Sequence, residues 1–186
     1  MRKAKAGSTP PPENVTKLEG AERLLKTSIR LFFEEGDMLA IHALVAGAHE
    51  VLRTLLSKRN QKGSFIKDND YIRSEHLSEY LKHMNRTQNF LKHADRDPDE
   101  VLDFYQAATP FWIFDSIGMY IKLNGSMKHK AFLLFFAWFA QEHPGLLKQG
   151  ALADKVNLFK SNSCVTKEHF ADLMRNPGLF DSKDYL

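Results

Sequence analysis

The sequence predicts an all-α fold, namely a bundle of about five main helices followed by short C-terminal helices. Apolar residues recur every three or four positions along most of the chain, which is the spacing of one helix face. The alternating patterns that predict strands are nearly absent. Gly, Pro and Asn-Gly pairs separate the periodic segments, as expected at the ends of helices.

The composition is that of one ordinary globular domain with a core. The chain has 186 residues, of which 43% are hydrophobic and 26% are charged. The net charge of +3 is too small to indicate a nucleic-acid-binding protein by itself. Residues 1–16 are basic and rich in Pro, so we expect a flexible arm there and a single helical-bundle domain over residues 17–186.

Three sequence features bear on the location of the protein in the cell. Cys164 is the single cysteine, which excludes an internal disulfide and favours the reducing cytoplasm. No apolar run follows the basic start, as a signal peptide would require. The longest apolar run, residues 131–140, is too short to cross a membrane, so it is predicted to be a buried core helix. We expect a cytoplasmic protein without membrane association.

The first two helices are predicted over residues 17–35 and 38–58. Gly36 lies between them, where a glycine commonly ends a helix. Asp37 has a side chain suited to capping the start of the second helix. The apolar stripe of that helix consists of Ile41, Leu44, Val45, Ala48, Leu52 and Leu55.

A polar, basic loop is predicted over residues 59–70, and a helix of about seven turns over residues 71–96. We expect the rest of the chain to be organised around this long helix. The stripe predicted to face the core contains Leu77, Leu81, Met84, Gln88 and Leu91. The opposite face, where a surface helix usually has Lys and Glu, carries His83, Arg86, Phe90 and His93.

Further helices are predicted over residues 99–108, 111–123, 127–142, 146–159 and 166–175. Pro98 and Pro110 suit the first turns of the first two, and Ser126 can cap the third. Asp115 has aromatic and aliphatic neighbours in the sequence. If Asp115 is buried it needs a partner, because an unpaired charge in a core is very costly.

Arg86 and His93 are the sharpest candidates for functional residues. They are seven residues apart, so on a helix their side chains point to within about 20° of the same direction. They also lie about 10 Å apart along the axis, which is too far for one helix to bring both to one phosphate. Two such helices crossing about a two-fold axis would bring four groups together, and Phe90 would supply apolar area for that contact.

This pattern resembles a known family of helical bundles. Arg86, six further residues and His93 are similar to the Arg-x(4–6)-His motif of HEPN domains, the higher eukaryotes and prokaryotes nucleotide-binding bundles. The preceding stretch MLAIHALVAGAHEVLRTLL resembles their second helix, which is rich in small residues. The run NFLKHADRDP also resembles a group of uncharacterised bacterial helical proteins. The resemblance extends roughly over residues 17–124.

The resemblance implies a metal-independent ribonuclease of the toxin or defence type, which acts as a homodimer without a cofactor. It implies that His93 is the acid or base of RNA cleavage and that Arg86 pairs with phosphate oxygens. The residues expected to support catalysis or the dimer interface are His83, Asn89, Phe90 and Asp95. The cations expected to bind the flanking RNA backbone are Lys58, Arg59, Lys62 and Lys67.

Two alternatives stay open. Active members of the family often have Asn, Asp or His after the arginine, whereas this chain has Thr87, so the main alternative is a non-catalytic bundle that binds a nucleotide or a partner protein. A metal enzyme is the third hypothesis. The Glu-x-x-His spacing of di-iron bundles is absent, however, and no metal is expected. His42 and His49 are interpreted instead as partly buried, hydrogen-bonded side chains.

Overall fold

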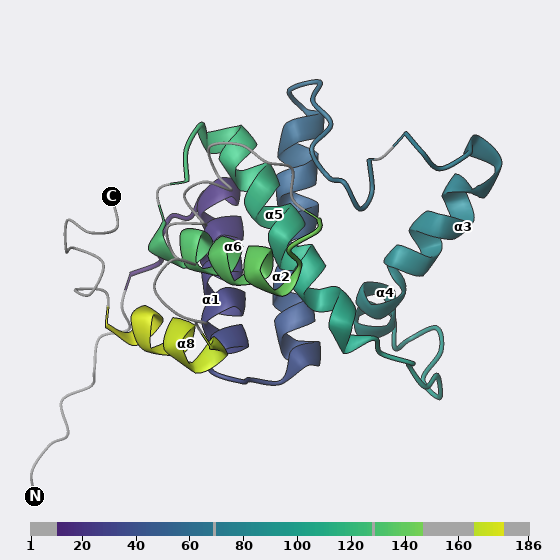
Figure 1. The fold of residues 1–186 in the computed structure, drawn as a ribbon. Coiled ribbons are helices and arrows are strands. Elements are labelled where there is room, and N and C mark those ends of the chain that lie inside the picture. The colour runs from purple at the N-terminus through teal and green to yellow at the C-terminus, as the bar shows by residue number, and fades with distance from the viewer. Residues whose placement is uncertain (1–10, 69, 128, 147–165, 177–186) are drawn as a thin grey trace, which may run out of the picture.

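The computed structural model of the chain contains helices and loops (Figure 1). The ranges that it describes are residues 11–68, 70–127, 129–146 and 166–176. Cys164, the predicted helix over residues 146–159 beyond its first residue, and residues 1–10 of the expected arm lie outside these ranges. The described residues form seven α-helices, one short 3-10 helix and no strand, which confirms the all-α prediction.

The helices are α1 (Lys17–Phe33), α2 (Met38–Ser57), α3 (Ser74–Met84), α4 (Arg86–Lys92), η1 (Gln106–Ala108), α5 (Thr109–Asn124), α6 (Lys130–Glu142) and α8 (Lys167–Arg175). Helix α2 packs between α1 and α5, α6 covers α1 and α5, and α8 closes against α1 and α6 (Figure 1). This arrangement puts the core inside the bundle, while α3 and α4 lie to one side of it.

The core is rich in aromatic side chains. Most residues of α6 are buried, as predicted for the apolar run, and the Phe135 ring lies 5.4 Å from that of Phe32 in α1. By length and hydropathy alone, α2 is the one described helix that meets the requirements of a membrane span. It packs against α1 and α5 along its length, and 44% of the apolar window is buried in the bundle.

Local signals set the ends of the first two helices. Helix α1 ends two residues before the predicted boundary, and Glu35 rather than Gly36 takes the left-handed conformation, with φ of 56°. The Gly36 N–H then donates to the Leu31 carbonyl at 2.8 Å, which closes the turn. The Asp37 carboxylate accepts from the Ala40 N–H at 2.8 Å, which confirms the predicted cap of α2.

The ends of α5 are also as predicted, but the start of α6 is not. Pro110 lies in the first turn of α5, and Gly125 ends that helix with φ of 76°. Ser126 does not cap the next helix, which begins at Lys130 instead of residue 127. The preceding residue, His129, is extended, and its Nε2 lies 3.1 Å from Glu22 Oε1 of α1.

The prediction of one long helix over residues 71–96 is wrong. The chain forms two helices, α3 and α4, that meet at Asn85. The backbone of Asn85 has φ of −89° and ψ of −2°, at the edge of the right-handed helical region, where the regular helix is interrupted. No residue of α3 or α4 is buried, and Leu91 of the expected core stripe is 43% exposed. The stripe stays largely exposed because the bundle covers only its end, at Met84.

The helix predicted over residues 99–108 is likewise absent. Residues 101–105 have no regular structure, and only η1 follows before α5. Phe104 turns inward, where its ring meets that of His42 at 5.5 Å, whereas Val101 and Tyr105 are exposed. From here on, the arm means α3, α4 and the segment up to residue 105, and not the N-terminal residues 1–16.

Candidate functional site

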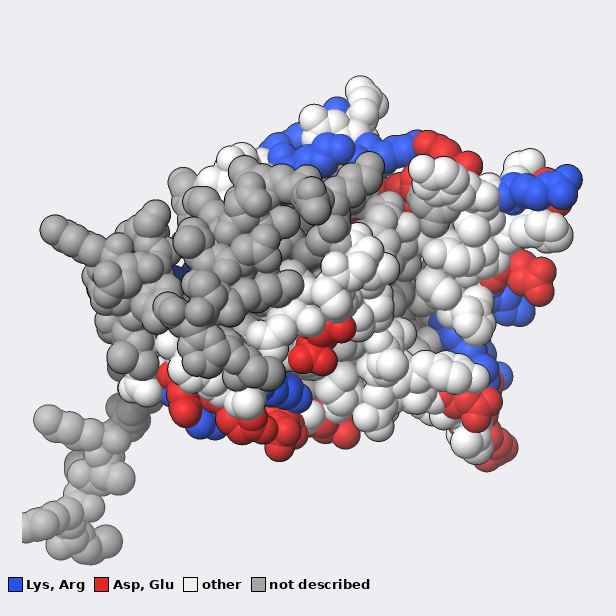
Figure 2. Space-filling model, in the orientation of Figure 1, with Lys and Arg blue, Asp and Glu red and all other residues white. Residues whose placement is uncertain are grey.

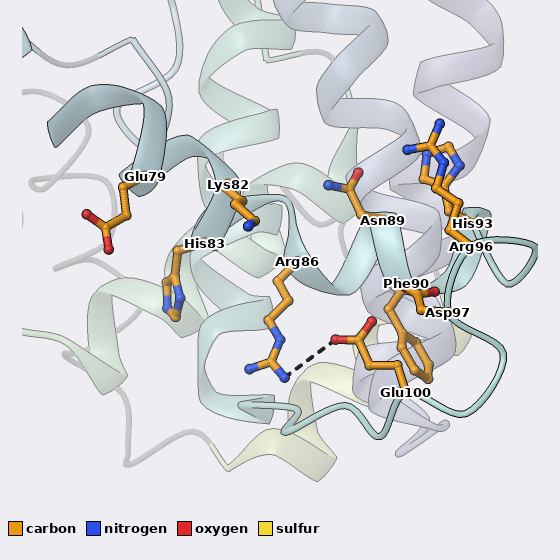
Figure 3. Close-up of a pocket in the computed structure, with 10 residues that line it drawn as sticks. All are labelled: Glu79, Lys82, His83, Arg86, Asn89, Phe90, His93, Arg96, Asp97 and Glu100. Atoms are coloured by element: carbon orange, nitrogen blue, oxygen red, sulfur yellow. Dashed lines mark ion pairs between the residues drawn. The ribbon is translucent and has the colours of Figure 1, made fainter. Parts of the chain in front are cut away.

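A groove of about 650 Å³ runs between α3, α4 and the segment that follows α4 (Figure 3). Its lining residues are Glu79, Lys82, His83, Arg86, Asn89, Phe90, His93, Arg96, Asp97 and Glu100. The groove therefore brings together all but one of the residues predicted to be catalytic or supporting. The exception is Asp95, which is exposed and does not line the groove.

The two candidate catalytic residues lie at opposite ends of α4. Arg86 is the first residue of the helix, and His93 ends it, with its N–H donating to the Asn89 carbonyl at 3.0 Å. A helix of this length rises about 10 Å, so both side chains face one groove without meeting at one point. Figure 3 shows Arg86 reaching toward Glu100, whereas His93 and Arg96 point away from Arg86.

The charge of Arg86 is only loosely neutralised. Its guanidinium lies 3.7 Å from a Glu100 oxygen and 4.0 Å from an Asp103 oxygen, both at the long end for ion pairs. The Arg86 side chain also keeps 40% of its surface accessible, and such exposed pairs contribute little stability. A phosphate entering the groove would therefore compete with weak partners.

The groove combines the groups that phosphate chemistry requires. Histidine readily takes up and releases protons near neutral pH, and His83 and His93 both line the groove. Guanidinium groups pair with two phosphate oxygens at once, and Arg86 and Arg96 supply two of them. The lining also contains Asn89, whose amide can donate and accept hydrogen bonds.

The predicted RNA-binding cations do not lie in this groove. Lys58, Arg59 and Lys62 follow the far end of α2, where Arg59 Nη1 donates to the Leu123 carbonyl at 3.0 Å (Figure 1). Lys62 forms an ion pair with the exposed Asp70.

Lys67 differs from the other three, because its side chain is buried. Its ammonium lies 3.2 Å from Glu50 Oε2 and 5.0 Å from the centre of the Trp112 ring. Burial lowers the pKa of Lys67, and the nearby Glu50 carboxylate partly opposes that shift. Lys67 therefore fixes the loop to the bundle, and its ammonium is not presented to a ligand on the surface.

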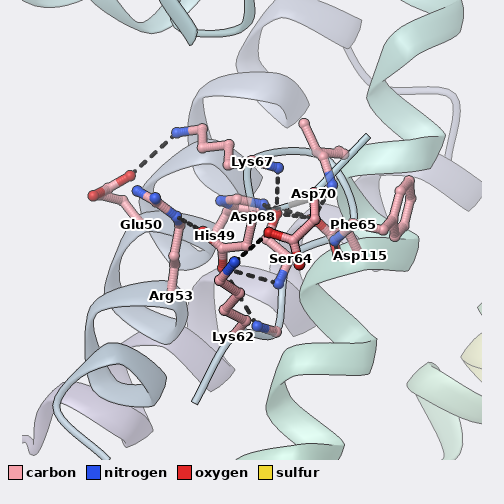
Figure 4. A network of polar contacts seen from close by, with 12 residues as sticks. His49, Glu50, Arg53, Lys62, Ser64, Phe65, Lys67, Asp68, Asp70 and Asp115 are labelled. Carbon is pink, nitrogen blue, oxygen red and sulfur yellow. Dashed lines mark hydrogen bonds and ion pairs between the residues drawn. The ribbon is translucent and has the colours of Figure 1, made fainter. Parts of the chain in front are cut away.

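A buried polar cluster around Asp115 is the feature that the sequence did not reveal (Figure 4). Asp115 Oδ2 accepts from the Ser64 hydroxyl at 2.6 Å and lies 2.9 Å from His49 Nε2. Asp115 Oδ1 accepts from the Phe65 N–H at 3.0 Å. The prediction that a buried Asp115 needs partners is confirmed. The partners come from α2 and from the loop after it, so this carboxylate holds the loop against α5.

The Ser, His and Asp of this cluster do not form a catalytic triad. A triad needs the histidine to accept from the serine through one ring nitrogen and donate to the aspartate through the other. Here His49 Nε2 faces both Ser64 and Asp115, and because a carboxylate only accepts, this nitrogen carries the hydrogen. Nδ1 of His49 has no hydrogen-bond partner among the described residues, and Ser64 is buried. The cluster is structural.

His42 and His49 are buried and hydrogen-bonded, which confirms the interpretation made from the sequence. His42 Nδ1 lies 3.1 Å from the Thr109 hydroxyl. Burial, with smaller effects from the charges of His49 and Lys67, lowers the pKa of His42 to about 4. Among the described residues, no three His, Cys, Asp or Glu side chains stand close enough together to hold a metal ion.

No protein-family model matches the chain, and no curated protein or solved structure is significantly similar to it. The resemblance to HEPN domains therefore stays a prediction.

Proposed function

We propose that the protein is a metal-independent endoribonuclease of the HEPN-like, toxin or defence type, acting in the cytoplasm as a homodimer. The observation that carries this proposal is that Arg86 and His93 line one groove together with His83 and Asn89. These groups match the needs of RNA cleavage, namely an acid, a base and a fixed cation, without a metal ion.

The reaction that these groups support begins at the ribose 2′-hydroxyl. His93 accepts the proton of this hydroxyl, whose oxygen attacks the adjacent phosphorus. A bond forms between the 2′-oxygen and phosphorus, and the bond to the 5′-oxygen breaks. The leaving 5′-oxygen takes a proton from a second acid, a role that His83 or the histidine of a second copy can fill. Arg86 stabilises the charge that develops on the phosphoryl oxygens.

A second copy of the chain would complete this site. Arg86 and His93 are separated along α4, so two copies of the helix bring a guanidinium and an imidazole to the same phosphate more readily than one. The groove has apolar area suited to this contact, because Phe90 lines it and stays partly exposed.

The charges of α3 also favour self-association. Glu75 and Glu79 lie in its N-terminal half, whereas Lys82 and His83 lie in its C-terminal half. Two α3 helices packed antiparallel about a two-fold axis would place the acidic half of each against the basic half of the other. We therefore include the arm in the proposed dimer interface.

The test is cleavage of single-stranded RNA in the presence of EDTA. DNA should be spared, because it lacks the 2′-hydroxyl nucleophile. His93→Ala should lower the rate by about 10²–10⁴-fold through loss of acid–base catalysis. Arg86→Ala should reduce it to a similar extent, and Arg86→Lys should restore it only in part, because an ammonium cannot make the paired contact.

Matched controls are available on the same arm. His76 and Arg73 are exposed and do not line the groove, so His76→Ala and Arg73→Ala should keep wild-type activity. All five variants should remain folded, with free energies of unfolding within about 0.5 kcal/mol of wild type. Cleavage that survives His93→Ala and Arg86→Ala together would contradict the proposal, as would an absence of cleavage by wild type across varied RNAs.

A second candidate function is binding without catalysis, of a nucleotide or a partner protein. The observation that favours it is the mixed charge of the groove, in which Glu79, Asp97 and Glu100 stand beside the cations. A wild type that leaves RNA intact but binds a nucleotide in calorimetry, with binding lost in Arg86→Ala, would support this function over the first.

A further inference from the structure

We propose that the end of the bundle opposite the arm's groove is a binding surface for single-stranded nucleic acid. This surface, the basic edge, consists of Lys58, Arg59, Lys62, Phe65, Tyr71 and Lys122. Bases would stack on its exposed rings, and phosphates would lie along its cations. The identity of the biological ligand as RNA rests on the proposed function. The surface itself is separate from the groove.

Contacts between distant segments bring the cations of the basic edge together. The Lys122 ammonium of α5 donates to the carbonyl of Lys62 in the loop, and Arg59 Nη1 donates to the carbonyl of Leu123. Each lysine or arginine side chain keeps further N–H groups for a ligand. Figure 2 shows blue atoms gathered along the upper edge of the molecule, over the end of α2 and the loop after it.

Two aromatic rings stand beside these cations. Phe65 is 47% exposed and Tyr71 is 96% exposed, and both line a hollow of about 480 Å³ together with Lys62 and Lys122. The backbone of Phe65 is fixed by the hydrogen bond from its N–H to Asp115. The ring centre also lies 6.0 Å from that of Phe114, so the Phe65 ring is presented from a held position, which reduces the entropy lost when a base stacks on it.

A second hollow continues the surface. It has a volume of about 330 Å³, and its lining includes Arg53 and Lys58. Lys62 and Asp68 line both hollows, so the two are neighbours. Neighbouring hollows that share Lys62 suit a ligand with repeated phosphates, such as a strand of several nucleotides.

The balance of charge across the two hollows favours an anionic ligand. Their linings contain four cations and two carboxylates, which leaves an excess of two positive charges. Asp68 is committed to Arg53 at 2.7 Å and to the amides of the loop. Asp70 is exposed and pairs only at the surface with Lys62. Removal of the Asp70 charge should therefore release Lys62 for the ligand.

The ligand class follows from the rings. An exposed aromatic ring stacks on a base only when the base is unpaired, so the basic edge should prefer a single strand to a duplex. A surface that merely attracts phosphate would instead respond to charge alone.

The experiment measures binding of a fluorescent oligothymidylate of about 12 nucleotides by anisotropy, at several salt concentrations. This probe has no 2′-hydroxyl, so the proposed cleavage cannot interfere. Tyr71→Ala should weaken binding about tenfold, whereas Tyr71→Phe, which keeps the ring, should bind like wild type. Lys122→Ala should weaken binding and lower the slope of log K against log salt by about 0.7.

One variant should act in the opposite direction. Asp70→Asn should tighten binding several-fold, because it removes a competing carboxylate without touching the core. Arg30→Ala removes an exposed cation in the last turn of α1, outside the basic edge, and should leave the affinity unchanged. An oligouridylate assayed on His93→Ala protein should give the same ranking of variants.

The outcomes separate this inference from the proposed function. Equal affinities of wild type, Tyr71→Ala and Lys122→Ala for the probe would overturn the inference. Tighter binding of a duplex than of the single strand would also overturn it. So would phosphatidylserine vesicles whose binding falls in the same variants, because the surface would then recognise a membrane. Loss of probe binding in Arg86→Ala alone would place the strand in the groove and also overturn it. If wild type cleaves no RNA but the ranking of edge variants holds, the inference stands and the proposed function fails.

Discussion

The bundle and the arm are built from similar helical sequences but differ in how they are held. In α2, residues such as Ile41, Val45 and Leu52 are completely buried between two neighbouring helices. In α3, the equivalent stripe of Leu77, Leu81 and Met84 is only half-buried, and no residue is inaccessible. The difference is the facing layer, which the bundle supplies along the whole of α2 but to α3 only near Met84.

This difference separates the stable core from the candidate site in the molecule. Isolated helices of about a dozen residues are marginal in water, so α3 depends on a few contacts such as the hydrogen bond from the Tyr80 hydroxyl to the Ile66 carbonyl, at 2.6 Å. Most of the free energy of folding comes from contacts within the bundle, whereas the groove with Arg86 and His93 lies on the arm. Substitutions in the two regions should therefore have different effects.

The largest effect on stability should come from Asp115→Ala. The substitution removes the acceptor of Ser64, His49 and the Phe65 amide at once, and leaves the buried Ser64 hydroxyl and His49 Nε2 only each other at 3.2 Å. Breaking a buried polar cluster in this way costs about 3–5 kcal/mol. The free energy of unfolding, measured in urea, should fall by that amount.

The matched control lies on the arm. Asp103 is an exposed carboxylate with a long contact to Arg86, so Asp103→Ala should change the free energy of unfolding by less than about 0.5 kcal/mol. A cost below about 1 kcal/mol for Asp115→Ala would show that the cluster does not hold the loop to the bundle.

The next effect concerns pH and His42. Burial lowers the pKa of folded His42 to about 4, from 6.5 for an unperturbed histidine. As the pH falls below about 6.5, the unfolded chain takes up a proton at His42 that the folded chain refuses, so folding loses stability. This loss continues down to about pH 4 and amounts to about 3 kcal/mol.

The contribution of His42 can be isolated with His42→Gln. Urea unfolding of both proteins between about pH 7 and pH 4 gives two stability curves, and their difference cancels the titration of the carboxylates. The wild type should lose about 3 kcal/mol more than the variant over this range. Parallel curves would mean that folded His42 binds its proton as readily as the unfolded chain does.

The smallest of the three effects on folding should come from Phe90→Ala in the arm. Phe90 is partly exposed in a helix without buried residues, so the free energy of unfolding of the monomer should fall by less than about 1 kcal/mol. The same substitution should raise the dimer dissociation constant at least about tenfold in analytical ultracentrifugation. In a two-fold dimer both copies lose the side chain, so the interface loses apolar area at two places. A wild type that sediments as a monomer at micromolar concentration would exclude the proposed dimer.

The parts of the fold that depend on local signals could be predicted from the sequence. The cap at Asp37, the proline in the first turn of α5 and the glycine at its end act within a few residues of themselves. The break at Asn85 could not be predicted, because asparagine is tolerated both inside helices and between them. The exposure of the α3 stripe was equally hidden, since periodicity predicts an apolar face but not what covers it.

The same distinction applies to the candidate site. The residues of the groove lie on one face of a short stretch of chain, so helical spacing was enough to group Arg86 with His93. The partners of Asp115 lie between 49 and 66 residues away in the sequence, and no local pattern links them to it. For Lys67, the sequence shows only a lysine in a polar loop, whereas burial beside Trp112 follows from tertiary packing.

The contact between Asp115 and the loop has a consequence for how the chain can vary. Ser64 and Asp115 are 51 residues apart in sequence, and their hydrogen bond fastens both ends of the segment that contains the arm. The arm is therefore an insertion between two fixed points of the bundle. Doubling the length of such a segment adds only about 0.6 kcal/mol of closure entropy. Arms of other lengths and shapes can be grafted between these points while the helices beneath them keep their packing.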